Sequence, residues 1–328
     1  MPTIMDVAAR AAVSMKTVSR VLNNEPHVRP AVRQRVELAV RELGYRPNLA
    51  ARQLAGTRSF IIAYPFNNPS PNYITDILMG AAEFCRDHGY HLVSEPVDLN
   101  PDAKTVIQRM LRTLKPDGVI LTPPLCDTPR IIEQFEQSGV PVVRIAGGRE
   151  LYGRSIILDE RAVSRQMVEH LVSLGHQRIG FIHPHPEHIL AQARYLGYLD
   201  GLAVAGIEPR NELVRQGLFD LASGVAAGEE LLSLPMPPTA IFAANDDMAL
   251  GVLQVAHRRG LSVPGDVAIA GFDDSPSSSI AWPPLTTVRQ PVRKLGCVAA
   301  RMLIEEDFET PDLSCALIIR ESTASKID

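Results

Sequence analysis

Cysteine is scarce in this chain, and its four residues lie far apart. Cys85, Cys126, Cys297 and Cys315 form no C-x-x-C pair within the 328 residues. The sequence therefore predicts neither a disulfide framework nor a zinc site. A reducing cytoplasm is the expected compartment.

Signals for export or membrane insertion are also missing. The chain does not open with a basic segment followed by an apolar one. No apolar run approaches the ~18 residues that a membrane-spanning helix requires. Both absences argue against a secreted solute-binding protein.

Catalytic motifs are equally absent. The sequence has no G-x-S-x-G elbow and no P-loop, and Gly147-Gly148 alone cannot form a dinucleotide site. The acidic residues show no spacing that would pair them as acid and base. The H-P-H-P-E-H segment at 183–188 carries metal-ligand residue types, but two prolines stiffen it and no cysteine is near. We expect no enzyme activity, no metal and no cofactor.

The charge is distributed unevenly along the chain. Residues 1–58 hold ten Lys or Arg and four Asp or Glu, a net charge of +6, whereas the whole chain carries −4. A basic head on an acidic body suggests that the head meets a polyanion while the body has another role. The alternative is a basic surface without a partner, and charge alone does not decide between the two.

Capping signals divide the first 45 residues into three short helices. Thr3 and Asp6 match a capping box, Ser14 can cap a second helix, and Pro30 opens a third that ends at Gly44. Apolar residues recur at helical spacing in each. Residues 46–58 hold at most a helix too short to be stable alone, so this segment is the expected domain boundary.

From residue 59 onward, short apolar runs alternate with amphipathic stretches, a pattern typical of parallel sheets with helices on both faces. The predicted strands lie near 60–64, 91–94, 118–121, 140–145, 179–182, 213–216, 240–243 and 267–270. The predicted helices cover about 74–88, 103–114, 130–138, 161–174, 194–205, 223–233 and 248–259. Two successive series indicate two lobes with a cleft between them. Ligands in such sheets bind at the carboxyl ends of the strands.

Three segments resemble a known family at the spacing the family uses. The stretch D-V-A-A-R-A-A-V-S-M-K-T-V-S-R-V-L-N-N at 6–24, the segment E-L-G-Y-R-P-N-L-A-A-R-Q-L at 42–54, and most of the body are similar to LacI/GalR-type (lactose-repressor) regulators. The resemblance implies a small all-α helix-turn-helix head and an α/β body. That body would have two doubly wound parallel-sheet lobes of the periplasmic-binding-protein type.

The second helix of the head is the predicted DNA reader. A tight turn at Ala12-Val13 can lay this helix in the major groove. The helix would project Met15, Lys16, Thr17 and Arg20, and the last three lie where the family reads bases. Arg and Lys suit guanine, and the Thr methyl suits the thymine methyl. The alternative is an ordinary solvated helix face. Ala12 departs from the glycine often found at this turn.

The segment after the head carries two further DNA-binding predictions. Asn48 lies in the R-P-N stretch that the resemblance covers. Leu54 matches the position from which similar regulators, as dimers, wedge paired leucines into the central minor groove. Such a wedge bends the duplex and requires a deformable central step. The alternative is a linker whose Leu54 packs on the body.

Polar residues at strand ends are the predicted effector contacts. Asn72 and Tyr73 follow the first strand of the body, where similar regulators place effector contacts. Arg194 begins a segment that resembles the family motif R-x-x-G-[FYW], whose arginine commonly binds effector oxygens. Asn245 and Asp273 follow two later strands. Together they supply bidentate donors and acceptors for vicinal hydroxyls. As alternatives, Arg194 would lie on a helix surface, and Asn245 and Asp273 would only cap helices.

Two aromatic residues complete this predicted site. Phe219 and Trp282 could offer apolar faces to a sugar ring. Trp282 also lies in W-P-P-L-T-T, which resembles a crossover between lobes, so a structural role is equally open.

The predicted organisation has a head at 1–46, a hinge at 47–58 and a body at 59–328. The N-terminal lobe covers about 59–158 and 289–320, and the C-terminal lobe about 159–288. The resemblance implies a cytoplasmic homodimer on near-palindromic operator DNA. It would be a repressor of carbohydrate-utilisation genes, controlled by a mono- or disaccharide. A corepressor-type regulator responding to a purine or another metabolite is one alternative, and a sugar-binding transport protein is another.

Overall fold

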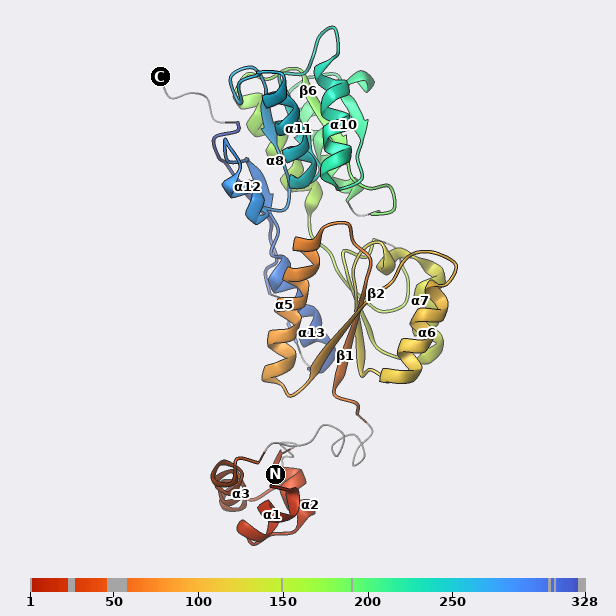
Figure 1. The fold of residues 1–328 in the computed structure, drawn as a ribbon, viewed down its shortest axis with the longest axis vertical. Helices are drawn as coiled ribbons and strands as arrows, with labels where there is room; N and C mark the ends of the chain where they lie inside the picture. Colours follow the sequence, from red (N-terminus) through yellow and green to blue (C-terminus); the bar gives the residue numbers. More distant parts are fainter. Residues whose placement is uncertain are drawn as a thin grey trace. The chain divides into compact units, whose positions relative to one another are not determined.

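The computed structural model describes residues 2–22, 27–45, 58–148, 150–189, 191–305, 308–309 and 311–323. The chain forms two compact units, a head up to Phe60 and a body from Ile61 (Figure 1). Within the described ranges, no helix combines the length and the apolar character needed to cross a membrane.

The head has three helices, α1 (Ile4–Arg10), α2 (Met15–Leu22) and α3 (Pro30–Leu43). The predicted capping box is present: the Thr3 side chain accepts from the Asp6 backbone, and Asp6 accepts from the Thr3 N–H at 2.7 Å. Gly44 ends α3 in the left-handed conformation. The buried side chains are all small, as three short helices require, and they are Val7, Ala8, Ala11, Val18, Val21, Val36 and Ala39.

The first lobe of the body is built on a parallel sheet of order β2-β1-β3-β4-β5. Its strands are β1 (Ile61–Phe66), β2 (His91–Pro96), β3 (Gly118–Leu121), β4 (Val142–Ile145) and β5 (Arg154–Ile156). Its helices are α5 (Pro71–Asp87), α6 (Ala103–Leu114), η1 (Leu125–Asp127), α7 (Pro129–Ser138) and α13 (Val292–Ile304). Helices α5 and α13 cover one face of the sheet, and α6 and α7 cover the other (Figure 1).

Glycine allows α5 and α13 to touch. A Cβ on Gly80 would lie 1.8 Å from the carbonyl oxygen of Arg293, and one on Gly296 would lie 2.2 Å from that of Ile77. No side chain fits at either distance, so the two helices depend on the missing Cβ atoms.

The second lobe repeats the architecture with the strand order β7-β6-β8-β9. Its strands are β6 (Ile179–His183), β7 (Val214–Gln216), β8 (Ala240–Ala243) and β9 (Ala268–Ala270). Its helices are α8 (Glu160–Ser173), α9 (Gln192–Val204), η2 (Asn211–Leu213), α10 (Leu221–Leu232), α11 (Asp246–Arg258) and α12 (Pro276–Ile280). Both sheets are fully parallel, with helices between the strands, so the predicted fold class is confirmed.

The end of the chain differs from the predicted lobe division, which assigned 289–320 to the first lobe. Only α13 packs on that sheet. Strand β11 (Ala316–Ile318) pairs antiparallel with β10 (Thr287–Arg289) and contacts α8. The Ser322 hydroxyl donates to the carbonyl of Ile269, within β9, and the Ser322 carbonyl accepts from the Ile269 N–H at 3.0 Å. The last described segment therefore belongs to the second lobe, because its backbone hydrogen bonds are made there.

Candidate functional site

A cavity opens at the carboxyl ends of strands from both lobes, where the alternating pattern predicted a ligand site. It holds about 460 Å³ of space that no atom fills, part of it open to solvent. The first lobe contributes Asn68, Ser70, Tyr73, Pro123 and Ala146. The second lobe and the crossover contribute Glu160, His188, Ala191, Arg194, Phe219, Asn245, Asp273 and Gln290.

Arg194, in the first turn of α9, supplies the positive charge among the cavity-lining residues that the structure describes. It is buried, and its guanidinium makes a bidentate pair with Glu160, from Nε at 2.8 Å and from Nη2 at 3.0 Å. Nη1 donates to the carbonyl of Ala244. The Phe272 ring lies 3.8 Å from the guanidinium carbon, an arrangement that adds cation–π attraction. Arg194 is thus held rigidly.

Asn245 positions an aromatic wall of the cavity. Its side-chain oxygen caps α11 by accepting from the Met248 N–H at 3.0 Å, and its amide donates to the Phe219 carbonyl at 3.0 Å. That second bond fixes Phe219 at a φ of 64°, a conformation that residues other than glycine rarely adopt. The Phe219 ring stands 5.0 Å from the His188 ring. Asn245 is therefore both a cap and a support for Phe219.

His188 and Tyr73 are uncharged parts of the lining. Burial lowers the pKa of His188 to about 3, so its imidazole is neutral at physiological pH. Burial also raises the pKa of Tyr73 well above its usual range, so its hydroxyl stays protonated. Tyr73 lies in the first turn of α5, and the Asn68 side chain supports the same turn by accepting from the Ser70 N–H at 2.9 Å.

Asp273 is the second carboxyl of the cavity. Its φ of 112° turns the loop after β9, and its carboxylate accepts from Gln290 at 2.7 Å. Arg194 Nη1 lies 3.7 Å away. Burial raises the pKa of Asp273 to about 8 despite the nearby arginine. The Asp273 carboxyl can therefore be either protonated or ionised near neutral pH, depending on the groups that it contacts.

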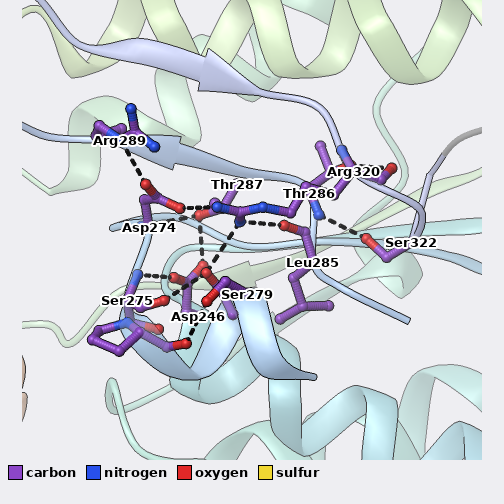
Figure 2. A network of polar contacts seen from close by, with 12 residues as sticks. Asp246, Asp274, Ser275, Ser279, Leu285, Thr286, Thr287, Arg289, Arg320 and Ser322 are labelled. Atoms are coloured by element: carbon purple, nitrogen blue, oxygen red, sulfur yellow. Dashed lines mark hydrogen bonds and ion pairs between the residues drawn. The ribbon is translucent and has the colours of Figure 1, made fainter. Parts of the chain in front are cut away.

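A polar network on the other side of this loop holds it in place. Figure 2 shows Asp274 paired with Arg289 and with Arg320. The hydrogen bond from Arg289 is 2.6 Å long. Asp246 accepts from the Ser275 backbone at 2.7 Å and from the Thr287 hydroxyl at 2.6 Å. These bonds join the loop after β9 to α11, β10 and the segment after β11. The cavity wall is therefore linked to the strands that cross between the lobes.

The cavity brings together five of the seven predicted effector residues, namely Tyr73, Arg194, Phe219, Asn245 and Asp273. The other two are placed elsewhere. Asn72 is exposed, and Trp282 is 79% exposed outside the cavity.

Sequence reasoning missed several lining residues, above all Glu160, His188 and Gln290. His188 had a signal, because the H-P-H-P-E-H segment follows a strand. Glu160 and Gln290 had none, since each looks like an ordinary residue at a helix start. Among the residues that the structure describes, no group of His, Cys, Asp or Glu could hold a metal ion.

In the head, the predicted DNA-reading residues occupy one helix. Met15, Lys16 and Arg20 of α2 are exposed. Thr17 is half-buried, and its hydroxyl lies 2.9 Å from that of Ser14, which caps α2 by accepting from the Thr17 N–H at 3.1 Å. Asn48 and Leu54 lie outside the described residues.

The turn before α2 forms although its residue is not glycine. Ala12 has a φ of 49°. The backbone therefore accepts some strain here to set the angle between α1 and α2.

Two family descriptions match the chain. Residues 3–48 match bacterial regulatory proteins of the lacI family, and residues 168–323 match a periplasmic binding protein-like domain. The chain is 34% identical over 316 residues, 95% of each chain, to catabolite control protein A of Priestia megaterium.

Two solved structures are also similar over nearly their whole length. One is the lac repressor dimer bound to operator and an anti-inducer, with 31% identity, a TM-score of 0.79 and 99% of each chain covered. The other is a complex of the transcriptional regulator CelR with cellobiose, with 32% identity and a TM-score of 0.73, covering 98% of this chain and 100% of that one.

Proposed function

The chain belongs to the lacI family of bacterial regulatory proteins, and we propose that it is a cytoplasmic repressor whose operator affinity is set by a sugar bound in the cavity between its lobes. The observation that supports this most directly is the cavity itself, whose lining combines the polar side chains of Arg194, Asn245 and Asp273 with the ring of Phe219. Hydrogen-bonding groups together with an aromatic ring are what a sugar requires. The protein acts by binding, and we propose no catalytic role.

The DNA contacts are proposed for α2. Its Met15, Lys16 and Arg20 are exposed while Val18 and Val21 are buried, so the helix is anchored on one side and free to enter a major groove on the other. Thr17 would contact DNA through its methyl group, because its hydroxyl is engaged by Ser14. Asn48 and Leu54 remain proposed contacts beyond the head.

We propose that the protein acts as a homodimer, as the lac repressor does in its operator complex. Two recognition helices about one helical turn apart would then read a near-palindromic site. Ile280 and Trp282 are 84% and 79% exposed, the two most exposed large apolar side chains among the described residues. Exposed apolar groups so close in sequence favour burial against a second copy. Trp282 is thus proposed for the dimer contact in place of the effector site.

Two observations support a sugar as the effector, namely the residues that line the cavity and the ligand of one similar structure. CelR has been seen with cellobiose. The effector would shift the protein between two lobe arrangements only as far as its affinity for the two differs. The network of Asp246, Asp274 and Thr287 would carry this change, since it joins the cavity wall to the crossover strands.

Fluorescence anisotropy on palindromic DNA tests the proposal. The purified chain is titrated at two salt concentrations while a panel of sugars is added. A salt-sensitive complex that one sugar dissolves supports the repressor and identifies its inducer. A complex that forms only with an added metabolite indicates a corepressor. Absence of DNA binding at low salt, with and without sugars, would contradict the proposal.

Two lysine variants provide a matched control. Lys16→Ala in α2 is expected to weaken operator binding about 10-fold. Lys104→Ala, at another exposed lysine, in α6 of the body, should leave binding unchanged. Equal effects of the two variants would place the DNA contact elsewhere.

A further inference from the structure

We propose that the cavity accepts an uncharged, hydroxyl-bearing effector and rejects anionic ones, and that Glu160 is the residue responsible for this selectivity. The inference rests on the proposed function, because it concerns the ligand of the same cavity. It narrows the effector class to neutral sugars and comparable polyols. Sugar phosphates and uronates are excluded.

The first support is the charge of the lining. Arg194 is the only cation among its described residues, and it faces two carboxyls, Glu160 and Asp273. His188 adds no positive charge, because its pKa is about 3. With Asp273 protonated, the lining is neutral, and with Asp273 ionised it carries one negative charge. In neither state does it attract an anion.

The second support is that Arg194 is already occupied. Its Nε and Nη2 groups each donate a hydrogen bond to the Glu160 carboxylate. A phosphate or carboxylate ligand would need these same two donors for a bidentate contact. Nη1 is engaged by the Ala244 carbonyl. Glu160 thus stands in the place of an anionic effector group.

The third support is the position of the pair. The side chains of Arg194 and Glu160 are each 7% exposed, and the Phe272 ring covers a face of the guanidinium. An incoming anion would have to displace Glu160 and leave that carboxylate buried without its partner. Breaking a buried pair in this way is strongly unfavourable.

The hydrogen-bonding groups of the lining that remain available determine which ligands the cavity can bind. The carboxylates of Glu160 and Asp273 only accept hydrogen bonds when ionised, so they suit the hydroxyl donors of a ligand. The ring of Phe219 supplies an apolar surface for the carbon skeleton. A neutral sugar offers both features.

Calorimetric titration of the full-length chain tests the selectivity with matched ligand pairs. The pairs are glucose with glucose 6-phosphate, galactose with galacturonate, and cellobiose with cellobionate. For any neutral member that binds, the anionic member should bind at least about 100-fold more weakly, as expected when like charges meet in a buried site. An anionic member that binds as tightly as its neutral partner would overturn the proposal.

Inorganic phosphate tests the role of Glu160 without knowledge of the effector. The wild-type chain should show no phosphate binding up to the detection limit, whereas Glu160→Gln should bind phosphate at least about 10-fold more tightly than that limit, because Arg194 is released. Asp273→Asn, at a side chain that is 20% exposed against 7% for Glu160, should show a smaller gain in the same direction. The double variant Glu160→Met/Arg194→Met removes both charges and should bind no phosphate.

Phosphate binding by the wild type that Arg194→Met abolishes would overturn the proposal. So would folded Glu160→Gln and Asp273→Asn variants that both fail to gain phosphate. If Glu160→Gln does not fold, phosphate binding by Asp273→Asn and by the wild type tests the proposal instead. Operator binding by the wild type, measured in the same preparation, separates failure of this inference from failure of the proposed function.

Discussion

Asp273 and Asp274 are consecutive residues whose carboxylates serve different structures. Asp273 lines the cavity and accepts from Gln290, whereas Asp274 pairs with Arg289 and Arg320 outside it. Both residues have positive φ, 112° and 53°. The loop is thus held in an uncommon conformation by bonds to the crossover strands, so that one carboxyl is presented to a ligand while its neighbour anchors the wall.

The two arginines that bind Asp274 should contribute unequally to stability. The side chain of Arg320 is 18% exposed, and it also donates to the Leu285 carbonyl at 2.8 Å. Arg320→Ala is expected to lower the free energy of unfolding by about 2–3 kcal/mol, because it removes the more buried of the two arginines that pair with Asp274 and also removes a donor from the Leu285 carbonyl. The side chain of Arg289 is 58% exposed. Arg289→Ala should therefore cost less than about 1 kcal/mol. Urea denaturation of both variants measures the difference, and equal losses would show that the network is not organised as described.

Stability above pH 7 should depend on Asp273. Its pKa is about 8 in the folded protein, whereas an unfolded aspartate has a pKa of about 3.9. Between these two values the folded state holds a proton that the unfolded chain has released, so stability is lost as the pH rises from about 4 to 8 and levels off above the folded pKa. The melting temperature should fall from pH 7 to 8 in the wild type, level off towards pH 9, and fall less in Asp273→Asn. His188, with a pKa of about 3, does not titrate in this window.

Asp200→Asn is the control for this titration. Asp200 pairs with Arg161 at the surface, and that hydrogen bond lowers its pKa from the ordinary value. It is fully ionised above pH 7 in both states, so its removal should leave the slope unchanged. The same slope in all three proteins would contradict the assignment to Asp273.

The head should be stabilised by glycine at position 12. Ala12 has a φ of 49°, a conformation that costs a residue with a Cβ roughly 1 kcal/mol relative to glycine. Ala12→Gly should slow amide hydrogen exchange in α1 and α2 of the full-length chain. Ala9→Gly, at an exposed position inside α1, should have the opposite effect by about 1 kcal/mol. Faster exchange in Ala12→Gly would rule out strain at this turn.

A methyl group at position 80 should destabilise the first lobe. The Cβ of Gly80→Ala would meet the Arg293 carbonyl at 1.8 Å, so α13 would have to move away from α5. We expect a loss of about 1–3 kcal/mol in thermal or chemical unfolding. Met79→Ala, one residue earlier at a side chain that is 45% exposed, should change stability little. A neutral Gly80→Ala would show that the two helices are not in close contact.

Local signals in the sequence were sufficient for the fold class and for most elements, although they did not predict β5, α12, β10, α13 and β11. The Thr3–Asp6 capping box, Pro30 at the start of α3 and Gly44 at its end act within a few residues, so they can be read without knowing the fold. The same holds for the alternation of apolar strands and amphipathic helices, because each element carries its own hydrophobic period. The family resemblance followed from motifs in order along the chain.

The partners of individual side chains were decided by the tertiary structure. Glu160 and Arg194 are 34 residues apart and meet only because α8 packs on α9. From the sequence, Trp282 was equally open to a ligand contact and to a structural role, and the path of the crossover leaves its side chain exposed. The β11 segment was assigned to the wrong lobe because strand pairing depends on distant backbone groups. Hydrophobic period and capping are properties of neighbours in sequence, whereas the charge of a pocket is a property of neighbours in space.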